Sequence, residues 1–229
     1  MHLQLRQAVC DANKLLDTYK LVICSWGNVS AIDRAAGVVA IKPSGVPYAD
    51  LTPESIVLLD LGGNVIAGDL NPSSDTPTHL ELYRNLKSIS AVCHTHSPKA
   101  TIWAQACREI PCFGTTHADF AYGPVPITDP LTEDETANDY ELNTGRVIVR
   151  RFRNLDCAHF PAVLVANHGP FTWADNAEHA VENALMLEQI ADMALGTILV
   201  SPDQPPIPQH LLDKHFLRKH GKNAYYGQR

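Results

Sequence analysis

The amino-acid sequence predicts an α/β protein with one buried core. β-branched segments separated by glycine turns predict paired strands in the first third of the chain, and apolar residues at helical spacing predict amphipathic helices near both ends. A chain of 229 residues is long enough to bury such a core, and nothing in its composition requires a second one. We therefore expect a single domain over residues 1–229.

The first third of the chain predicts one helix and four strands. An amphipathic helix over about the first twenty residues is indicated by helical spacing of the apolar residues Leu5, Val9, Ala12, Leu16 and Tyr19. Segments 28–32 and 38–41 flank a glycine turn and predict a hairpin. Segments 56–61 and 65–67 flank a Gly-Gly-Asn turn and predict a second hairpin.

The middle of the chain predicts two helices around a strand. We expect a helix over Pro77–Leu86, because Asp75 or Thr76 can cap it and proline suits an early helical position. Segment 90–96 then predicts a short strand, and segment 99–107 predicts the second helix.

The second half of the chain predicts one strand and two helices. The strand over 163–166 ends at a sharp Asn-His-Gly-Pro corner. The helix over 177–194 has the clearest 3.6-residue periodicity, and a proline-rich connector leads from it to a last helix over 209–219. Two regions are less regular: segment 110–128 is loop-rich with a strand or two, and the acidic segment 132–140 predicts the start of a helix.

Composition and charge exclude several classes of function. With 18 basic and 25 acidic side chains the formal charge is -7, and the basic residues form no stripe that could neutralise a nucleic-acid backbone. The six cysteines show no C-x-x-C pair, which predicts reduced and mostly buried thiols. The chain lacks a signal-like N-terminus, and no stretch approaches the ~20 apolar residues of a membrane span. We therefore expect a cytoplasmic protein.

Histidines supply the sharpest chemical signal. In His94-Thr95-His96, two imidazoles two residues apart on a strand project to the same face and can bind one ion. His168 is the best candidate for a third ligand, because it lies where an apolar strand runs into Gly-Pro and strand ends reach clefts. A histidine that caps a turn would explain His168 equally well.

Asp75 offers a carboxylate to the same metal site. Three imidazoles and one oxygen ligand suit zinc or manganese better than calcium or magnesium. Alternatively, Asp75 caps the following helix and pairs with His79 one turn later. For Asp75 alone, capping is the simpler interpretation.

Three turn segments could wrap an anion, because glycine permits close backbone approach and serine hydroxyls add donors. They are Gly27-Asn28, Ser44-Gly45 and Ser73-Ser74. Lys42 could add a positive charge, although a solvated lysine is the alternative. Ordinary turns explain any one segment equally well, and no Walker or dinucleotide fingerprint is present.

Asp119 and Tyr226 are candidates for proton transfer. A desolvated aspartate can act as base or acid, and a tyrosine, with a reference pKa of about 10, can donate to a forming alkoxide. Taken from composition alone, Asp119 is a loop carboxylate and Tyr226 a frayed tail residue.

The motifs together resemble the class II aldolase and adducin-head superfamily over nearly the whole chain, and within it the L-ribulose-5-phosphate 4-epimerases. The residues that carry the resemblance are Trp26-Gly27-Asn28-Val29-Ser30, Ile41-Lys42-Pro43-Ser44-Gly45-Val46, Pro72-Ser73-Ser74-Asp75-Thr76-Pro77-Thr78-His79, His94-Thr95-His96-Ser97, Thr115-Thr116-His117-Ala118-Asp119, His168-Gly169-Pro170-Phe171, Leu211-Leu212-Asp213-Lys214-His215 and Tyr225-Tyr226-Gly227-Gln228.

The resemblance implies a three-layer αβα fold with a central, largely antiparallel sheet flanked by helices, assembled as a homotetramer with active sites between subunits. It implies metal binding by His94, His96 and His168, with Asp75 as a ligand or close partner. It implies phosphate binding by Gly27, Asn28, Ser44, Gly45, Ser73 and Ser74. Asp119 and Tyr226 would come from a neighbouring subunit as proton donor and acceptor, with auxiliary roles for Lys42, Thr115, Glu141 and His215.

The activity implied by the resemblance is interconversion of L-ribulose 5-phosphate and D-xylulose 5-phosphate. One divalent metal per subunit, zinc or alternatively manganese, would act as a Lewis acid while the C3–C4 bond breaks and re-forms. A sugar-phosphate aldolase of the L-fuculose 1-phosphate type is the alternative, although such aldolases carry Glu at the place of Asp75 and lack Asp119. A non-catalytic, adducin-head-like scaffold is disfavoured by the intact histidines.

Overall fold

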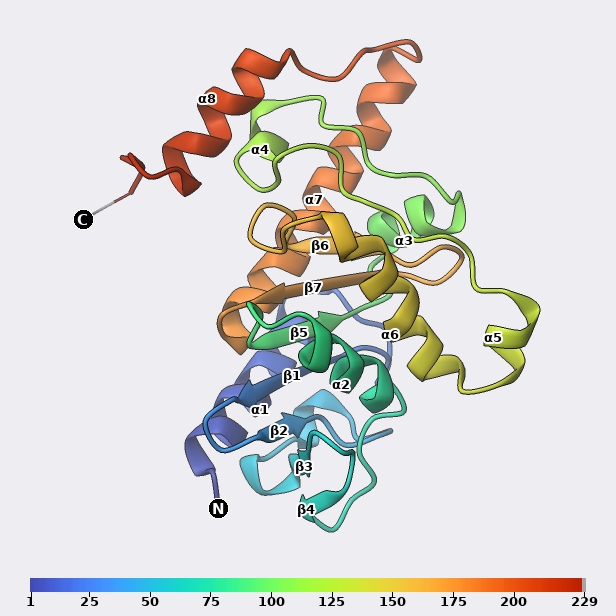
Figure 1. Cartoon of the computed structure of the whole chain (residues 1–229), viewed down its shortest axis with the longest axis vertical. Helices are drawn as coiled ribbons and strands as arrows, with labels where there is room; N and C mark the ends of the chain where they lie inside the picture. Colours follow the sequence, from blue (N-terminus) through green and yellow to red (C-terminus); the bar gives the residue numbers. More distant parts are fainter. Residues whose placement is uncertain (228–229) are drawn as a thin grey trace.

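Within residues 1–227, the computed structural model has one seven-stranded antiparallel sheet in the order β4-β3-β2-β1-β5-β7-β6 (Figure 1). Gln228, the last residue of the C-terminal motif, lies outside these described residues. The strands are β1 Asn28–Asp33, β2 Val38–Ile41, β3 Val57–Asp60, β4 Val65–Ala67, β5 Ala91–His94, β6 Ala162–Leu164 and β7 Pro170–Ala174.

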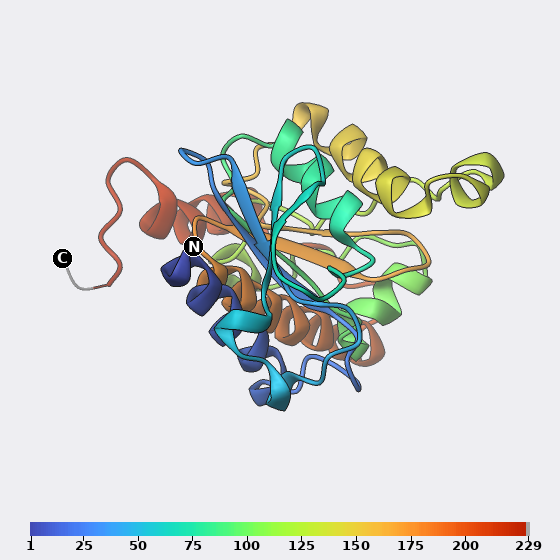
Figure 2. The ribbon, with the colours of Figure 1, turned by 90° about the horizontal axis from the view of Figure 1, so that it is seen from below.

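Helices cover both faces of the sheet. Helices α1 (Leu3–Thr18) and α7 (Ala177–Val200) pack on one face, and α2 (Thr76–Asn85) and α6 (Tyr140–Arg151) pack on the other. Figure 2 shows the sheet between these two layers. The prediction of a three-layer αβα fold with a central antiparallel sheet is therefore confirmed.

The remaining helices lie around this sandwich. Helices α4 and α8 pack on each other at the end of the molecule farthest from the N-terminus, and α5 projects sideways from α6 (Figure 1). Their bounds are α3 Pro98–Gln105, α4 Thr115–Ala118, α5 Glu133–Ala137 and α8 Gln209–His220, and short 3-10 turns occupy Tyr48–Asp50, Pro53–Ser55 and Phe152–Asn154.

The strands are buried on both faces because apolar side chains alternate between the two helical layers. In β5, Ala91 and Cys93 join the core under α1 and α7, whereas Val92 joins the core under α2 and α6. In β1, Val29 belongs to the first core and Ile32 to the second. This two-sided burial explains the nearly continuous apolar strands, whereas the edge strand β4 is largely exposed.

The central strands bring distant segments together at one end of the sheet. Strand β5 pairs with β1 on one side and with β7 on the other. In this register His94 lies opposite both Asn28 and Phe171. The ends of three strands that are far apart in sequence therefore meet beside His94.

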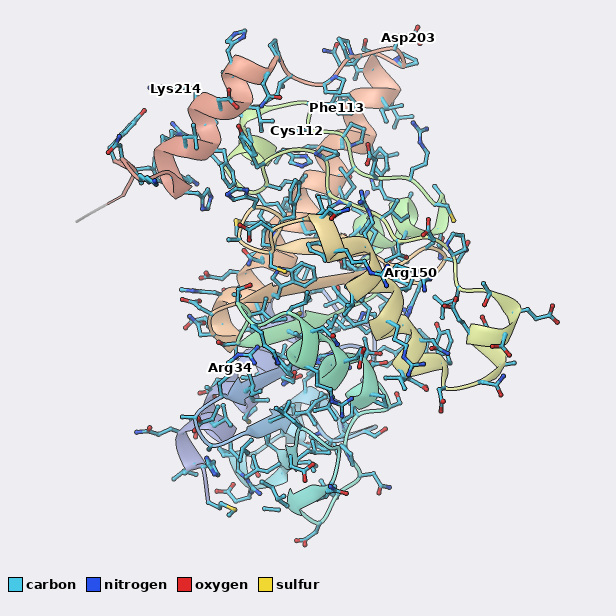
Figure 3. The ribbon with its side chains drawn as sticks, in the orientation of Figure 1. Arg34, Cys112, Phe113, Arg150, Asp203 and Lys214 are labelled. Atoms are coloured by element: carbon cyan, nitrogen blue, oxygen red, sulfur yellow. The ribbon has the colours of Figure 1, made fainter. Side chains whose placement is uncertain are left out.

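Two arginines tie peripheral elements to the core. Arg34, labelled near the β1–β2 hairpin in Figure 3, donates hydrogen bonds to the carbonyl groups of Tyr83, Leu86 and Ile89. Arg150 of α6 forms an ion pair with Glu135 of α5 at 3.1 Å. The first contact fixes the hairpin to the segment after α2, and the second holds α5 against α6.

Two predicted regions differ from the structure. Segment 110–128 forms isolated bridges and the short helix α4, and it contributes no strand to the sheet. The acidic segment does start a helix, but α5 ends at Ala137 and the longer helix α6 begins at Tyr140, after Asp139 adopts a left-handed conformation with φ of 49°. No glycine or proline marks this break in the local sequence, although aspartate is one of the few other residues that adopt this conformation.

Strand β7 was not predicted from the sequence, because its first residue, Pro170, is a proline that directly follows a sharp corner. Pro170 can begin a strand, since a first residue does not need to donate to the sheet. The residues after it, Phe171 to Ala174, pair with both β5 and β6. The Asn-His-Gly-Pro corner is therefore the tight connection between two strands of one sheet.

Helix α7 is longer than predicted, because it continues from Ala194 to Val200. By length and composition alone it could cross a membrane, contrary to the expectation that no segment reaches that limit. Core helices of soluble proteins meet the same criterion. Here Ala180, Leu187 and Ala191 of α7 are buried in the cores beneath the sheet.

All six cysteines are free thiols, as predicted. Four of them are buried, whereas Cys24 and Cys107 are exposed. Burial raises the pKa of the Cys93 thiol to about 12. The core thiols are therefore protonated and chemically inert at neutral pH.

Candidate metal centre and phosphate pocket

The three predicted histidine ligands converge at the end of β5. The Nε2 atoms of His94 and His96 lie 3.1 Å apart, and the His168 ring centroid lies 4.8 and 5.0 Å from theirs. One nitrogen from each ring lies within 4.8 Å of the others. Two nitrogens on one tetrahedral zinc are about 3.3–3.4 Å apart, because Zn–N bonds measure about 2.0–2.1 Å. The three imidazoles therefore fit a single divalent cation.

Gly169 allows the third histidine to approach the other two. A Cβ at this position would lie 2.9 Å from the Thr95 carbonyl oxygen and within 3.7 Å of both the His94 and His96 rings. Asn167, on the other side of His168, has a positive φ of 62°. The corner between β6 and β7 is thus shaped to bring His168 against the end of β5.

The ring of His94 is held in its orientation by Pro170 and Phe171. Its Nδ1 lies 2.9 Å from the carbonyl oxygen of Pro170, and its ring stacks on Phe171 with centroids 4.1 Å apart. Because a carbonyl can only accept, Nδ1 carries the proton and donates it. The lone pair of Nε2 is then free for a metal.

Electrostatics favours neutral imidazoles in this cluster. Burial, together with the neighbouring His94 and His96, lowers the pKa of His168 to about 3. Burial and His94 likewise lower the pKa of His96. At neutral pH the His96 and His168 rings are therefore neutral, with one nitrogen lone pair each, which is the form that binds a metal.

Asp75 is held beside the histidines and does not cap a helix. It occupies the N-cap position of α2, but its side chain makes no capping hydrogen bond. Instead, Asn28 Nδ2 donates to Asp75 Oδ2 at 2.6 Å. Burial alone would raise the pKa of Asp75, yet His94, His79 and Asn28 together lower it, so the carboxylate is charged. The capping interpretation is therefore wrong.

His79 does not pair with Asp75 as the alternative required. Its Nδ1 lies 2.7 Å from the Ser30 hydroxyl, which also contacts the Tyr83 hydroxyl at 2.7 Å. His79 is completely buried, and burial lowers its pKa to about 3. It belongs to a polar chain inside the core, behind the metal centre.

The turn segments predicted to bind phosphate line one cavity of about 540 Å³ together with the histidines. Two of the loops are fastened to each other, since Ser44 N donates to Asn71 O at 2.9 Å and Ser73 N donates to Lys42 O at 3.0 Å. The cavity brings together the predicted residues Gly27, Asn28, Lys42, Ser44, Gly45, Ser73, Ser74, Asp75, His94, His96, Glu141 and His168.

Lys42 is a buried lysine, not a solvated one. Only 2% of the residue is exposed, and burial lowers the pKa of its amine to about 8. Nζ donates to the Pro43 carbonyl at 3.2 Å and lies 5.0 Å from the Tyr48 ring centroid. With a pKa of about 8 the amine is still mostly protonated at neutral pH. Its positive charge lies in the same cavity as the serine and glycine loops.

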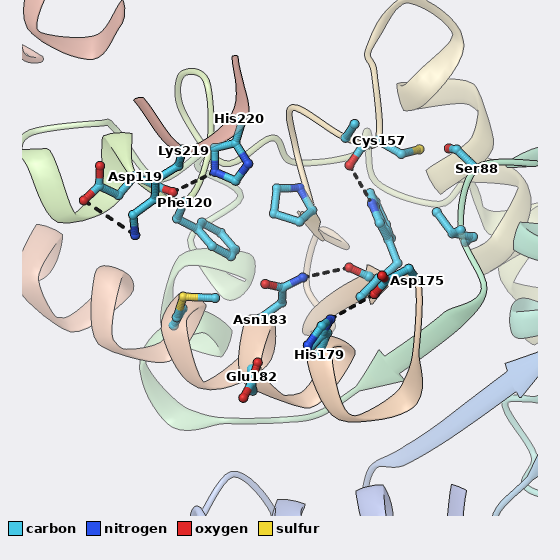
Figure 4. A pocket seen from close by; sticks show the side chains of 16 residues that line it. Ser88, Asp119, Phe120, Cys157, Asp175, His179, Glu182, Asn183, Lys219 and His220 are labelled. Carbon is cyan, nitrogen blue, oxygen red and sulfur yellow. Dashed lines mark hydrogen bonds and ion pairs between the residues drawn. The ribbon is translucent and has the colours of Figure 1, made fainter. Parts of the chain in front are cut away.

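The remaining candidates form a second group on α4 and α8, around Asp119. Arg218 Nη2 donates to Asp119 Oδ2 at 2.6 Å, while His215 Nδ1 lies 3.1 Å from Oδ1. Lys219 Nζ lies 3.7 Å from Oδ2 (Figure 4). Burial alone would raise the pKa of Asp119, but Arg218, His215 and Lys219 lower it.

Tyr226 and Thr115 belong to the same end of the molecule. The Tyr226 ring lies against the cations of Arg218 and Lys219, at 5.0 and 4.5 Å. Thr115 is the first residue of α4, which contacts α8. Asp119 lines a separate cavity of about 600 Å³ (Figure 4), and neither it nor Thr115, His215 or Tyr226 lines the cavity of the histidines within this chain.

Four residues of the histidine cavity were not predicted as site residues, namely Ser25, Trp26, Pro43 and Tyr140, and the two aromatic ones lie near the histidine rings. Trp26 is 60% exposed at the cavity, with its ring centroid 6.5 Å from that of His96. The Tyr140 hydroxyl oxygen lies 3.3 Å from His168 Nδ1. Trp26 lies within the motif Trp26-Gly27-Asn28-Val29-Ser30, but only its neighbours Gly27 and Asn28 have groups suited to binding phosphate. Tyr140 had no local signal except its position next to Glu141.

Solved structures share this architecture. An L-fuculose 1-phosphate aldolase is 25% identical with a TM-score of 0.78, covering 93% of this chain and 94% of that chain. YgbL of Klebsiella pneumoniae, described as a candidate aldolase, epimerase or decarboxylase, is 22% identical with a TM-score of 0.73 and covers 92% and 97%. The L-fuculose 1-phosphate aldolase of Glaciozyma antarctica PI12 is 18% identical with a TM-score of 0.77 and covers 97% and 84%.

Residues 7–195 match the family described as Class II Aldolase and Adducin N-terminal domain. This match contains β1 to β7, both helical layers and all three histidines of the candidate metal centre. The protein therefore belongs to the class II aldolase and adducin N-terminal domain family.

Proposed function

We propose that this protein is a metal-dependent L-ribulose-5-phosphate 4-epimerase that interconverts L-ribulose 5-phosphate and D-xylulose 5-phosphate. One observation carries the proposal: three histidines with converging nitrogens and three small-residue loops line the same cavity. A metal site next to an anion site suits a small phosphorylated sugar. The volume of about 540 Å³ is within the usual range for small-molecule sites.

His94, His96 and His168 would hold the metal, with Asp75 as a fourth ligand or as an anion beside it. Three nitrogens and one carboxylate favour zinc, and manganese is the alternative. When bound, the cation supplies a Lewis acid for a carbonyl oxygen of the sugar. Asn28 holds the Asp75 carboxylate in place by its hydrogen bond of 2.6 Å.

The phosphate of the substrate would bind at Gly27, Asn28, Ser44, Gly45, Ser73 and Ser74. Backbone N–H groups and serine hydroxyls can surround an anion without arginine. Gly45 has a φ of 70° and no atom within 4 Å of a would-be Cβ, so its backbone is open to a ligand. The buried amine of Lys42 adds a positive charge to this end of the cavity.

In the proposed reaction the bond between C3 and C4 breaks and re-forms. The C4 hydroxyl loses its proton as the bond breaks, which gives an aldehyde fragment that keeps the phosphate. This fragment stays anchored by its phosphate, rotates, and presents its opposite face. When the bond re-forms, the proton returns to the C4 oxygen. Asp119 and Tyr226 would accept and donate this proton from opposite sides of C4.

This assignment requires a second copy of the chain. Asp119 and Tyr226 do not line the histidine cavity of their own chain, so in this proposal they reach the sugar from a neighbouring subunit. We therefore propose a homotetramer with shared active sites, in which Thr115 and His215 accompany Asp119. We also propose that residues 1–229 form one domain and that the protein is cytoplasmic.

A sugar-phosphate aldolase of the L-fuculose 1-phosphate type is the second candidate, since solved structures of that name share the fold. An aldolase would release the two fragments, whereas an epimerase recaptures them. A non-catalytic scaffold predicts neither stoichiometric metal nor binding of a phosphorylated sugar.

Product identification by NMR tests the proposal. The purified protein, loaded with zinc, is incubated with L-ribulose 5-phosphate and separately with L-fuculose 1-phosphate. We expect D-xylulose 5-phosphate from the first, no cleavage of the second, loss of turnover after chelation, and recovery with zinc or manganese. Turnover that is undiminished in metal-free protein contradicts the mechanism, and free aldehyde products indicate an aldolase.

A further inference from the structure

Tyr140 has no part in the proposed reaction, although it lines the same cavity as the histidines. Its hydroxyl lies 3.3 Å from His168 Nδ1, and the two rings are tilted by 31° with centroids 6.1 Å apart. An imidazole has two nitrogens, and the partner of one decides which of them is protonated. With Nδ1 facing Tyr140, the nitrogen of His168 left for a cation is Nε2.

His94 shows the same arrangement with a different partner. Its Nδ1 donates to the Pro170 carbonyl at 2.9 Å, which leaves Nε2 facing His96. Metal-binding histidines commonly donate their second N–H to an oxygen, and this contact sets both ring orientation and ligand basicity. The Tyr140 hydroxyl is the only oxygen found at His168 Nδ1 among the described residues.

The position of Tyr140 is set by several contacts of the fold. It is the first residue of α6, and its carbonyl accepts a hydrogen bond from the Thr144 hydroxyl at 3.0 Å. The next carbonyl, that of Glu141, accepts from the Thr78 hydroxyl of α2. Close packing of α6 on α2 at Gly145 holds the whole helix end in place.

The hydroxyl of Tyr140 is suited to this contact. A phenol oxygen has lone pairs that can accept a hydrogen bond from Nδ1–H, and the contact at 3.3 Å places that oxygen at His168 Nδ1.

We propose that Tyr140 is a positioning residue for the metal centre, holding His168 in the Nδ1–H tautomer so that Nε2 is directed to the cation. The inference rests on the proposed function only in requiring that the three histidines bind a metal. Tyr140 would thus contribute a side chain from α6 to the metal centre. The three histidines themselves come from the end of β5, the turn after it and the turn before β7.

Zinc affinity and the tautomer of His168 test the inference, using the full-length Tyr140→Phe variant. Competition with a chromophoric chelator should show zinc binding weakened by about 10–100-fold, the range typical for loss of a partner behind a metal ligand. In the metal-free protein, ¹⁵N NMR of the histidine rings should show the Nδ1–H form of His168 replaced in part by Nε2–H. A purely structural role for the hydroxyl would leave this ratio unchanged.

Tyr19→Phe is the matched control, because Tyr19 packs against the core beside α1 and does not line the cavity. Its zinc affinity and histidine spectrum should equal those of the wild type. Equal zinc affinity and equal tautomer ratio in Tyr140→Phe and wild type overturn the inference while leaving the metal site intact. A wild-type protein that binds no zinc defeats the proposed function itself, and the inference with it.

Discussion

At the scale of single residues, the site depends on how closely the backbone can approach the histidines. Gly169 lies between His168 and β7, and a methyl group there would meet the Thr95 carbonyl at 2.9 Å. That contact is shorter than real Cβ atoms tolerate, so either His168 or the end of β5 must move. The geometry of the three ligands would change with either movement.

Gly169→Ala should therefore weaken zinc binding by at least about tenfold, since misplacing a metal ligand costs more than losing its outer partner. The measurement is competition with a chelator on the purified variant. Gly196→Ala is the control, because a Cβ at Gly196 in α7 would meet nothing within 4 Å. Unchanged affinity in Gly169→Ala would show that the corner between β6 and β7 can relax without moving His168.

The cluster around Asp119 predicts a pH dependence of stability. Its folded-state pKa is below the ordinary value of 3.8, because Arg218, His215 and Lys219 outweigh the effect of burial. A lowered pKa stabilises the folded protein above the unfolded-state value, and this contribution disappears as pH falls through the folded-state value. The ion pairs of Asp119 should therefore contribute fully near neutral pH and vanish in acid.

Urea denaturation of wild type and Asp119→Asn at a series of pH values measures this contribution. The difference in free energy of unfolding should be constant between about pH 5 and pH 7 and shrink toward zero below about pH 4. If the difference in free energy of unfolding persists in acid, the stabilising effect of Asp119 does not depend on its negative charge. The same variant should retain its zinc, because Asp119 does not line the histidine cavity.

For single residues, the sequence predicted which side chains could bind a metal better than it predicted their burial and hydrogen-bond partners. The His94-Thr95-His96 pair was predicted from spacing on one strand, although β5 ends at His94 and His96 lies beyond it. The two rings still converge. Burial of Lys42 and the bond between Asp75 and Asn28 could not be predicted, because both depend on loops that are distant in sequence.

At the scale of elements, the packing of α6 on α2 positions one wall of the cavity. A Cβ at Gly145 would lie 2.7 Å from Glu81 Cβ and 3.1 Å from the Thr78 carbonyl oxygen. Glycine is therefore required where the two helices touch. This contact could not be predicted from the local sequence, since a glycine inside a helix usually indicates only lower helix stability. For the same reason Tyr140, which α6 carries to the site, could not be predicted.

Gly145→Ala should lower the free energy of unfolding by roughly 1–3 kcal/mol, as overpacking does in a tight contact. It should also raise the KM for the proposed phosphosugar substrate, because Tyr140 and Glu141 at the start of α6 would shift. Gly196→Ala again serves as the control, and it should stabilise the protein by about 0.5–1 kcal/mol, since it adds helix propensity without a clash. Urea denaturation and steady-state kinetics compare the two variants. Equal behaviour would show that the α2–α6 contact can open freely.

At the scale of the whole molecule, the chain carries two halves of one proposed site on different surfaces. The histidine cavity lies at the ends of β1, β5 and β7, whereas Asp119, His215 and Tyr226 lie around α4 and α8. The fold class, the helical layers and most strands could be predicted from periodicity and resemblance. Only the resemblance suggested that Asp119 and Tyr226 lie apart from the histidines of their own chain, because spacing along a sequence does not reveal which copy of a protein a residue serves.

Mixing two inactive variants tests whether the site is shared between subunits. His96→Ala removes a histidine of the proposed metal centre, and Asp119→Asn removes the proposed proton carrier. If each site combines the metal side of one chain with Asp119 of its neighbour, randomly mixed oligomers should regain about a quarter of the wild-type epimerase activity, since each half is intact with a probability of about one half. The variants are denatured together, refolded and assayed, with each variant refolded alone as the control. Activity no higher than that of the separate variants would place both groups on the same subunit or remove Asp119 from the reaction.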